Sequence, residues 1–389
     1  MAEWLKTSLI DIVELIGGGT PKTSKAEYWG GNINWLSVKD FNNENRYVYS
    51  TEKTITEEGL NNSSTKLLRK DDIIISARGT VGELAMIPFP MAFNQSCYGI
   101  RAKDGINSTF LYYLIKHSIR KLKSMTHGSV FDTITRDTFA NIEVAIPDIE
   151  TQQRIAKMLA DIDDKVENNQ RINNNLEQQA KAIFSNEFLT LETLPDGWKQ
   201  ASLIDIADYL NGLAMQKYRP TADETGIPVL KIKELRQGCC DDNSELCSPS
   251  IKSEYIIHDG DVIFSWSGSL IVDFWCGGIC GLNQHLFKVT SNKYNKWFYY
   301  AWTKHHLDRF IAVAADKATT MGHIKRDELS KAEVLIPNEA DYKRIETLLQ
   351  PIFDLIIANR IENKKLAETR DALLPKLMSG ELDVSNIEL

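Results

Sequence analysis

The feature of this sequence that most limits its possible folds is an internal repeat of almost half the chain. The segment Ser8–Ile12 returns letter for letter as Ser202–Ile206, 194 positions later. Further matches follow in unbroken order at similar offsets: Asp72–Ser76 with Asp261–Ser265, Asn94-Gln95 with Asn283-Gln284, and Glu143–Pro147 with Glu333–Pro337. A period of this length is a domain with an appendage, not a solenoid unit. The sequence therefore predicts a tandem duplication of one globule.

The composition is that of a folded chain with more than one core. The 389 residues exceed the usual size of a single core, and 43% are hydrophobic while 25% are charged. No apolar run is long enough to span a membrane, and the first residues lack the pattern of a secretory signal. Six cysteines are too few for a disulfide framework, so we expect a cytoplasmic protein. A net charge of −8 argues against a nucleic-acid binder that acts alone.

Each half begins with a segment of mixed secondary structure. The buried-type runs Asp72–Ser76 and Asp261–Ser265 predict strands, and the glycines at 17–19 and 277–278 predict loops. Residues 108–123 place apolar side chains on one helical face. The expected fold of each half is therefore an α+β globule.

A long helix is expected after each globule. Pro147 and Pro337 end the globules, and Asp148 and Asn338 follow as N-cap residues. The heptad-like spacing then predicts two coiled-coil helices with Asn at central seam steps, where it fixes register at a cost in stability. We expect Pro351 to kink the second helix or delay its start, and Pro375 to end or bend it. The helix-pairing positions are Ile155, Leu159, Ile162, Val166, Asn169, Asn173 and Leu176, with Ile345, Leu349, Ile352, Ile356, Asn359, Asn363 and Leu366.

These patterns predict four segments. Residues 1–147 and 195–337 form the two globules, 148–194 the first helix, and 338–389 the second helix with a tail. If the helices pair antiparallel, the two similar globules are separated by a pair of long coiled-coil helices with pseudo-two-fold symmetry. A seam of about 29 residues is roughly 43 Å long at 1.5 Å per residue, close to the ~34–36 Å of one B-DNA turn.

The sequence carries no convincing catalytic motif. Residues 17–23 resemble a phosphate loop only superficially, because the lysine spacing is wrong and Pro21 removes an N–H donor. Pro147-Asp148 with Asp163–Lys165 mimics a nuclease pattern, but these residues fall on a boundary and on the coiled-coil helix. Cys276 and Cys280 have cysteines nearby, yet no C-x2-C pair indicates zinc. We expect no catalytic residue and no metal site.

Taken in order, several motifs resemble the specificity subunit of type I restriction-modification enzymes. The resemblance covers essentially the whole chain and includes the tandem plan of globule and helix. The second half departs from it at Leu213–Met215 and Trp266–Gly268. The motifs are Gly17–Pro21 with Tyr28–Gly31, Ala77–Gly82, Ala92–Ser96, the helix start at Ile146–Ala156 with Leu176-Glu177, and the C-terminal Leu373–Leu382.

The resemblance implies a recognition subunit without chemistry of its own. Each globule is then a target-recognition domain for one half of a bipartite double-stranded DNA site. The helices set the gap and dock two methyltransferase subunits, while separate restriction and translocase subunits complete the enzyme. S-adenosylmethionine and ATP are expected on those partners, with no cofactor on this chain and no membrane contact. The alternatives are a coiled-coil scaffold without DNA readout and, more remotely, an enzyme in its own right.

Base reading requires forked donors or amides at groove depth. Phosphate contacts require nearby donors, and we expect them from Thr20, Lys22, Lys39, Lys231 and Lys233. Arg78 follows a predicted strand in a glycine-containing loop, and the paired Asn-Gln dipeptides carry amides suited to adenine. Because the dipeptides recur in both halves, a shared structural role is the alternative. The candidate DNA-binding residues are Thr20, Lys22, Lys39, Arg78, Thr80, Asn94, Gln95, Gly128, Ser129, Lys231, Lys233, Ser267, Asn283, Gln284, Gly322 and His323.

Overall fold

The chain divides into two compact units, each of which contains one globule and part of both long helices. The computed structural model describes residues 4–43, 45–126, 133–316, 324, 326–385 and 387. Unit 1 comprises Met1–Glu167 and Leu366–Leu389, and unit 2 comprises Asn168–Lys365. We call residues 1–147 lobe 1 and residues 195–337 lobe 2.

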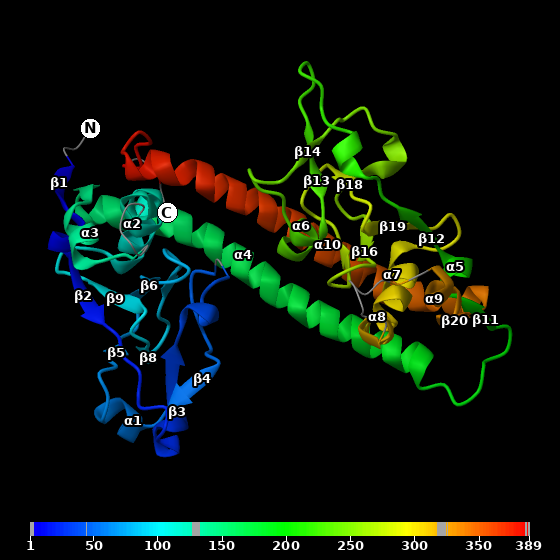
Figure 1. Ribbon diagram of the computed structural model, residues 1–389, viewed down its shortest axis with the longest axis horizontal. Helices are drawn as coiled ribbons and strands as arrows, with labels where there is room; N and C mark the ends of the chain where they lie inside the picture. Colours follow the sequence, from blue (N-terminus) through cyan, green and yellow to red (C-terminus); the bar gives the residue numbers. More distant parts are fainter. Residues whose placement is uncertain are drawn as a thin grey trace. The chain divides into compact units, whose positions relative to one another are not determined.

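Lobe 1 contains ten short strands and three α-helices in its described residues (Figure 1). The strands are β1 (Leu5–Ser8), β2 (Val13–Gly17), β3 (Trp29–Leu36), β4 (Lys53–Ile55), β5 (Leu67–Leu68), β6 (Ile73–Ser76), β7 (Leu84–Met86), β8 (Met91–Phe93), β9 (Cys97–Ala102) and β10 (Glu143–Ile146). The helices are α1 (Glu57–Asn61), α2 (Ser108–Thr126) and α3 (Arg136–Ala140).

The described part of lobe 2 also has ten strands, with five helices among them. The strands are β11 (Lys199–Ser202), β12 (Asp208–Asn211), β13 (Ile227–Leu230), β14 (Leu246–Cys247), β15 (Ile256–Ile257), β16 (Val262–Ser265), β17 (Ile271–Phe274), β18 (Cys280–Leu282), β19 (Leu286–Thr290) and β20 (Glu333–Ile336). The helices are α5 (Leu203–Ile206), α6 (Ile232–Gln237), α7 (Lys296–His305), α8 (Leu307–Asp316) and α9 (Arg326–Ser330).

The two lobes have the same sheet topology. Lobe 1 has sheets in the order β2-β9-β6-β7 and β4-β3-β8-β5, with the separate pair β1-β10. Lobe 2 repeats this order as β12-β19-β16-β17 and β14-β13-β18-β15, with the pair β11-β20. Even the parallel pairing of β3 with β8 recurs, between β13 and β18. The prediction of two similar α+β globules is therefore confirmed.

The strands predicted from uninterrupted apolar runs lie between two cores. On β6, Ile73 and Ile75 join the core that contains α2, whereas Ile74 faces the core under the second sheet. On β16, Val262 and Phe264 face one core and Ile263 the other. Burial on both faces explains why these strands show no apolar–polar alternation. It also makes their C-terminal ends rigid supports for the loops that follow.

The two long helices are α4 (Ile149–Phe184), followed by a π-helical turn over Ser185–Leu189, and α10 (Glu339–Met378). Their caps are those predicted, because Asp148 Oδ1 accepts from the Thr151 N–H at 2.9 Å and Asn338 Oδ1 accepts from the Asp341 N–H at 2.9 Å. Hydrogen bonds from the backbone and hydroxyl of Thr151 hold the pKa of Asp148 below its ordinary value.

A delayed start at Pro351 and an end at Pro375 are wrong, whereas the alternatives, a kink at Pro351 and a bend at Pro375, stay predictions. Helix α10 begins at Glu339 and continues through both Pro351 and Pro375 to Met378. Each proline lacks an N–H donor and so removes one helical hydrogen bond. Around Pro351 the helix is held from outside, because Leu349 and Phe353 are buried in the core of lobe 2. Tertiary packing here outweighs the local propensity.

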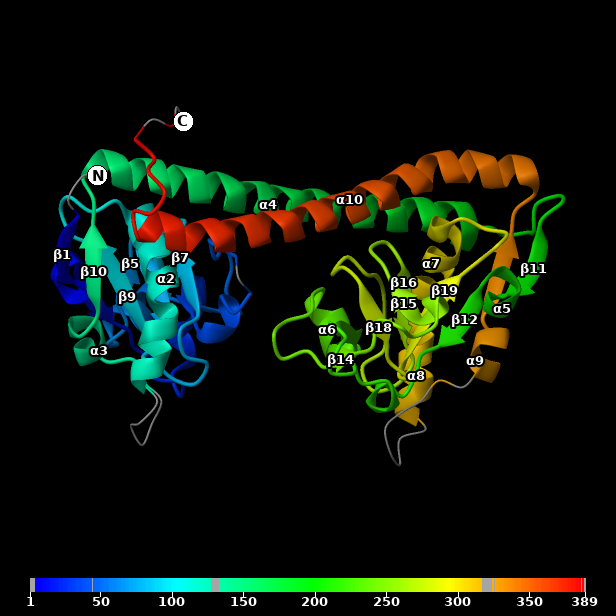
Figure 2. The ribbon, with the colours of Figure 1, turned by 90° about the horizontal axis from the view of Figure 1, so that it is seen from above.

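Within each unit, α4 and α10 lie side by side and run antiparallel (Figure 2). In unit 2, Asn169 contacts Asn363 and Asn173 contacts Asn359, so residue numbers fall on one helix as they rise on the other. In unit 1, Asp163 contacts Arg370 in the same register. No helix among the described residues is both long enough and apolar enough to cross a bilayer.

Candidate nucleic-acid interface

Three loops meet in lobe 1 at the C-terminal ends of β2, β6 and β8. They are residues 18–22, 77–83 and 94–96, and we call them together the three-loop edge of lobe 1. The Gly19 N–H donates to the Phe93 carbonyl at 3.0 Å, and the Ala77 N–H donates to the Ser96 carbonyl at 2.8 Å. The hydroxyl of Thr20 donates to Oε1 of Gln95. The structure thus brings together the predicted residues Thr20, Gln95 and the Arg78 loop.

The three-loop edge of lobe 2 is built in the same way from residues 212–216, 266–270 and 283–285. The Leu213 N–H donates to the Leu282 carbonyl at 2.9 Å, and the Trp266 N–H donates to the His285 carbonyl at 3.4 Å. These bonds repeat those of Gly19 and Ala77 in lobe 1. The duplicated backbone therefore presents the same three loops in both lobes, with different side chains on them.

One glycine in each lobe allows this close approach. A Cβ atom on Gly18 would collide with the carbonyl of Asn94, and one on Gly212 would collide with the carbonyl of Asn283. Both glycines lie at equivalent positions of the repeat. Their function in the edge is to let the first loop pack directly on the Asn-Gln turn.

Arg78 is the cation of the loop that follows β6 in lobe 1. Arg78, Gly79 and Thr80 are exposed, and no group in the described residues pairs with the Arg78 guanidinium. The loop turns through Gly79 and Gly82, whose φ angles are +78° and +87°. The fully buried Ser76 hydroxyl donates to the Thr80 carbonyl at 2.5 Å and accepts from the Glu83 N–H at 2.8 Å. A buried clamp therefore holds a loop that extends Arg78 into solvent.

Ser267 occupies the position of Arg78 in lobe 2, but its side chain does not extend into solvent. Its side chain is only 2% exposed, and its hydroxyl lies 3.1 Å from Nδ1 of His285. This burial is unfavourable for the direct contact of the Ser267 side chain with DNA that the sequence predicted. Its hydroxyl instead orients His285, which is half-buried at the same edge.

The asparagines of the two Asn-Gln turns are engaged within the fold. Oδ1 of Asn94 accepts from the Ser96 N–H at 3.0 Å, and Oδ1 of Asn283 accepts from the His285 N–H at 3.2 Å. Such side-chain turns shape the backbone locally. The geometry favours the structural alternative for both asparagines, while Gln95 is exposed and Gln284 half-exposed beside them.

The predicted phosphate-contacting lysines differ between the lobes. Lys22 and Lys39 are exposed, and no carboxylate in the described residues pairs with either ammonium group. By contrast, Lys231 pairs with Glu245, and Lys233 lies 3.0 Å from Asp241. The hydrogen bond from Lys233 holds the pKa of Asp241 below its ordinary value. The lysines of lobe 2 are thus partly neutralised by acids.

Four candidates lie outside the described residues. They are Gly128, Ser129, Gly322 and His323.

The predicted helix-pairing residues divide into two groups. Ile155 and Leu159 are fully buried in the core of unit 1, and Ile345, Leu349 and Ile356 are buried in that of unit 2. The four asparagines meet in pairs, and the remaining positions are half-buried, namely Ile162, Val166, Leu176, Ile352 and Leu366. Asp163, part of the nuclease-like pattern, is bound to Arg370 and Tyr113.

Sequence reasoning missed the residues that hold the edge loops. The clamp residue Ser76 and its equivalent Ser265, whose hydroxyl donates to the Ser267 carbonyl at 3.2 Å, end the repeated Asp-x-x-x-Ser motif. That repetition was a usable signal. Trp266 and His285, whose rings lie 6.1 Å apart, replace Ala77 and Ser96 of lobe 1. The proximity of Trp266 and His285 depends on strand pairing, and no pattern in the sequence predicts it.

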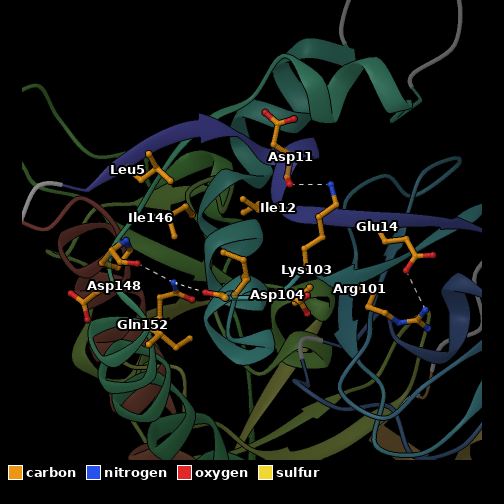
Figure 3. Close-up of a pocket in the computed structure, with 15 residues that line it drawn as sticks. Leu5, Asp11, Ile12, Glu14, Arg101, Lys103, Asp104, Ile146, Asp148 and Gln152 are labelled. Atoms are coloured by element: carbon orange, nitrogen blue, oxygen red, sulfur yellow. Dashed lines mark hydrogen bonds and ion pairs between the residues drawn. The ribbon is translucent and has the colours of Figure 1, made fainter.

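The cavity shown in Figure 3 lies at the other end of β9 from the edge of lobe 1. Its volume is about 910 Å³. Lys103 donates to the Asp11 carbonyl at 2.9 Å, Arg101 pairs with Glu14 and Asp72, and Gln152 donates to the Pro147 carbonyl at 3.0 Å. Its polar side chains therefore join strands to the start of α4. No cluster of potential metal ligands occurs in the described part of the chain.

Comparison with known families identifies the architecture. The family model for the type I restriction modification DNA specificity domain matches residues 1–178 and again 195–368. The chain belongs to this family of type I restriction-modification specificity proteins. The two matches coincide with the two halves of the repeat, so the specificity domain occurs twice.

Individual relatives agree with this assignment. The chain is 30% identical to the type I restriction enzyme MjaIX specificity subunit of Methanocaldococcus jannaschii, over 99% of this chain and 95% of that protein. It is 32% identical to the EcoR124I/EcoR124II specificity subunit of Escherichia coli over 41% of each chain. The crystal structure of the S subunit of a type I restriction-modification system from M. genitalium has a TM-score of 0.61 at 14% identity, covering 99% and 97% of the two chains.

Proposed function

We propose that this specificity protein is the non-catalytic DNA-reading subunit of a type I restriction-modification complex. Each lobe reads one half of a bipartite duplex site. The chemistry lies on methyltransferase subunits that bind S-adenosylmethionine and on restriction and translocase subunits that use ATP. The observation that carries the proposal is the duplicated three-loop edge. It combines a constant backbone with side chains that differ between lobes.

This combination suits sequence recognition. Base readout requires side chains at defined positions, and loops on rigid strands supply them. The bonds of Gly19 and Ala77 have counterparts at Leu213 and Trp266, so the support is common to both lobes. The side chains at equivalent positions are unlike, as in Arg78 against Ser267. One fold can thereby address two different half-sites.

The paired helices suit a spacer with a defined length. Two asparagine contacts, the partly buried Asn169–Asn363 and the buried Asn173–Asn359, are each 2.8 Å long. A one-step slip would leave these amides against apolar side chains, which is costly. The register of α4 against α10 is therefore specific in unit 2, and we propose that the two continuous helices set the separation between the half-sites.

An apolar surface on α10 supports docking of another subunit. Leu348 and Leu355 are 43% and 45% exposed and lie two helical turns apart. Exposed apolar side chains in register on one helix face are typical of an interface. We assign this face to a methyltransferase subunit. We expect such partners to supply positive charge toward the DNA phosphates, because this chain has a net charge of −8.

Binding experiments test the proposal. The full chain is titrated with duplex DNA in gel-shift assays, alone and together with the methyltransferase subunits of its own restriction-modification system. We expect weak, poorly selective binding alone and selective binding in the complex, with adenine methylation mapped to one bipartite motif. A complex that assembles and yet shows no sequence preference would indicate the scaffold function instead. Methyl transfer or cleavage by the chain alone would indicate an enzyme.

A further inference from the structure

The equivalent glutamines Gln95 and Gln284 lie on backbone turns that have the same structure in the two lobes. Each follows the asparagine of the edge turn, and the turns are anchored alike. The Asn94 N–H donates to the Leu36 carbonyl at 3.0 Å, and the Asn283 N–H donates to the Leu230 carbonyl at 3.2 Å. Differences in what the two amides can offer DNA must therefore come from neighbouring side chains.

In lobe 1, Thr20 engages the oxygen of the glutamine. Its hydroxyl donates to Oε1 of Gln95, and within the described residues nothing binds the Nε2 group. Gln95 is exposed, so this NH₂ group is the part that it presents to solvent. Lobe 2 has Ala214 at the position of Thr20 and so lacks the hydroxyl.

In lobe 2, His285 engages the nitrogen of the glutamine. Nε2 of Gln284 lies 3.4 Å from Nε2 of His285. The other ring nitrogen lies 3.1 Å from the buried Ser267 hydroxyl, and the Trp266 ring packs 6.1 Å away. A neutral imidazole that donates from Nδ1 to Ser267 accepts from Gln284 at Nε2. Lobe 1 has Ser96 at this position and so lacks the ring.

The two lobes therefore bind opposite atoms of the equivalent glutamine amides, the oxygen in lobe 1 and the nitrogen in lobe 2. Among the described residues, no donor binds Oε1 of Gln284, which leaves this oxygen as an acceptor at the edge. Gln95 presents a donor at the edge whose next loop carries Arg78, and the Arg78 guanidinium is also a donor. In the major groove, a purely donating edge matches O6 and N7 of guanine, whereas an accepting oxygen matches the amino group of adenine or cytosine.

We infer that Thr20 and His285 are positioning residues that set the equivalent glutamines in opposite orientations toward their base pairs. This inference rests on the proposed function. Gln95 selects a base that offers acceptors, namely guanine, and Gln284 selects a base that offers an exocyclic amino group. Thr20 thereby acts in base selection and not as the phosphate contact that the sequence suggested.

The repeat supplies matched variants. Thr20→Ala introduces the residue that lobe 2 has there, and His285→Ser introduces the residue of lobe 1. Thr20→Ser retains the hydroxyl and serves as the conservative control. Each variant is assembled with the methyltransferase subunits. The methylated motif is mapped across a genome, and the complex is competed with duplexes that carry single base-pair changes.

For Thr20→Ala we expect discrimination at one position of one half-site to fall about tenfold or more, since a good amide–base pair contributes ~1–3 kcal/mol. The other half-site should be unchanged, and Thr20→Ser should behave as the wild type. His285→Ser should relax one position in the opposite half-site only. A loss of discrimination confined in this way is not expected from general destabilisation.

Three results would overturn the inference. The first is unchanged base preferences in both Thr20→Ala and His285→Ser. The second is relaxed discrimination in the same half-site by these two variants. The third is a loss of discrimination in Thr20→Ser as large as that in Thr20→Ala. If a variant fails to assemble, Gln95→Ala or Gln284→Ala provides the same positional readout. A wild-type complex that methylates no bipartite motif would refute the proposed function itself, which is a separate outcome.

Discussion

Asp163 on α4 and Arg370 on α10 form an ion pair that is buried on both sides. The guanidinium nitrogen lies 2.8 Å from the carboxylate, and each side chain is 7% exposed. The Tyr113 hydroxyl donates to the second carboxylate oxygen at 2.6 Å. Both helices and lobe 1 therefore meet at one carboxylate, which joins the C-terminal part of α10 to unit 1.

Removing the cation should destabilise unit 1 strongly. Arg370→Met leaves Asp163 charged and without its ionic partner in a buried site, at a cost of about 3–5 kcal/mol. Urea unfolding followed by circular dichroism measures the loss. The control is Asp161→Asn in the exposed pair of Lys157 and Asp161 on the same helix, which should change stability by less than about 1 kcal/mol. Equal effects of the two substitutions would contradict the importance of the buried pair.

A methyl group on Gly18 should disturb the three-loop edge of lobe 1. In Gly18→Ala the added carbon meets the Asn94 carbonyl, and overpacking of this kind costs about 1–3 kcal/mol. The neighbouring Gly17→Ala is a close control, because nothing lies within 4 Å of its Cβ position. Thermal unfolding should separate the two variants. A Gly17→Ala variant as unstable as Gly18→Ala would show that close packing is not the cause.

The asparagine seam should show strong coupling. Asn173→Ala removes the acceptor of the Asn359 amide in a buried seam, which costs about 1–3 kcal/mol. Replacing both Asn173 and Asn359 by leucine leaves no amide without a hydrogen-bond partner, and it should restore stability to the wild-type level or above. Asn174→Ala, at an exposed neighbouring position, is the control. If the double variant instead loses the sum of the unfolding free energies lost by the two single variants, the two amides do not depend on each other.

Acid should weaken lobe 2 through His306. Burial lowers the pKa of His306, whose Nε2 lies 2.7 Å from the Glu333 carbonyl. Below the unfolded pKa near 6.5, the unfolded chain takes up a proton that the folded chain accepts less readily. The unfolding free energy should therefore fall as pH drops from about 7.5 to about 5.5. His306→Gln should show a shallower dependence in the same titration, and an unchanged slope would argue against this histidine as the source.

Periodic features of the fold could be predicted from sequence. Local sequence patterns that do not depend on tertiary contacts predicted the repeat, the seam with its asparagines, and the caps Asp148 and Asn338. The buried strands β6 and β16 were recognisable for a similar reason, since a short apolar run between turn signals admits few interpretations.

Features that depend on pairing between distant strands could not be predicted. The meeting of residues 18–22 with 94–96 requires the order β2-β9-β6 and the parallel contact of β3 with β8, which no local pattern encodes. The burial of Ser267 and the contact of His285 with Gln284 follow from the same pairing. The delayed helix start at Pro351, one of two expectations there, is wrong because the packing of Leu349 and Phe353 in lobe 2 holds the helix around it.

The proposal that the helices measure the gap between half-sites can be tested by lengthening them. Seven residues in heptad register are inserted after Glu167 in α4 and after Lys365 in α10, where the two units divide. The helices gain about 10 Å, or about three base pairs at ~3.4 Å each. Inserting the heptad in only one helix should put the Asn169–Asn363 and Asn173–Asn359 pairs out of register with the Asp163–Arg370 pair, and it should abolish assembly.

Methylation mapping of the complex that contains the doubly lengthened chain tests the central claim most directly. The account predicts that both half-sites keep their sequences while the gap between them widens by about three base pairs. An unchanged gap, or a gap that widens together with altered half-sites, would contradict the assignment of base reading to the lobes and of spacing to the helices.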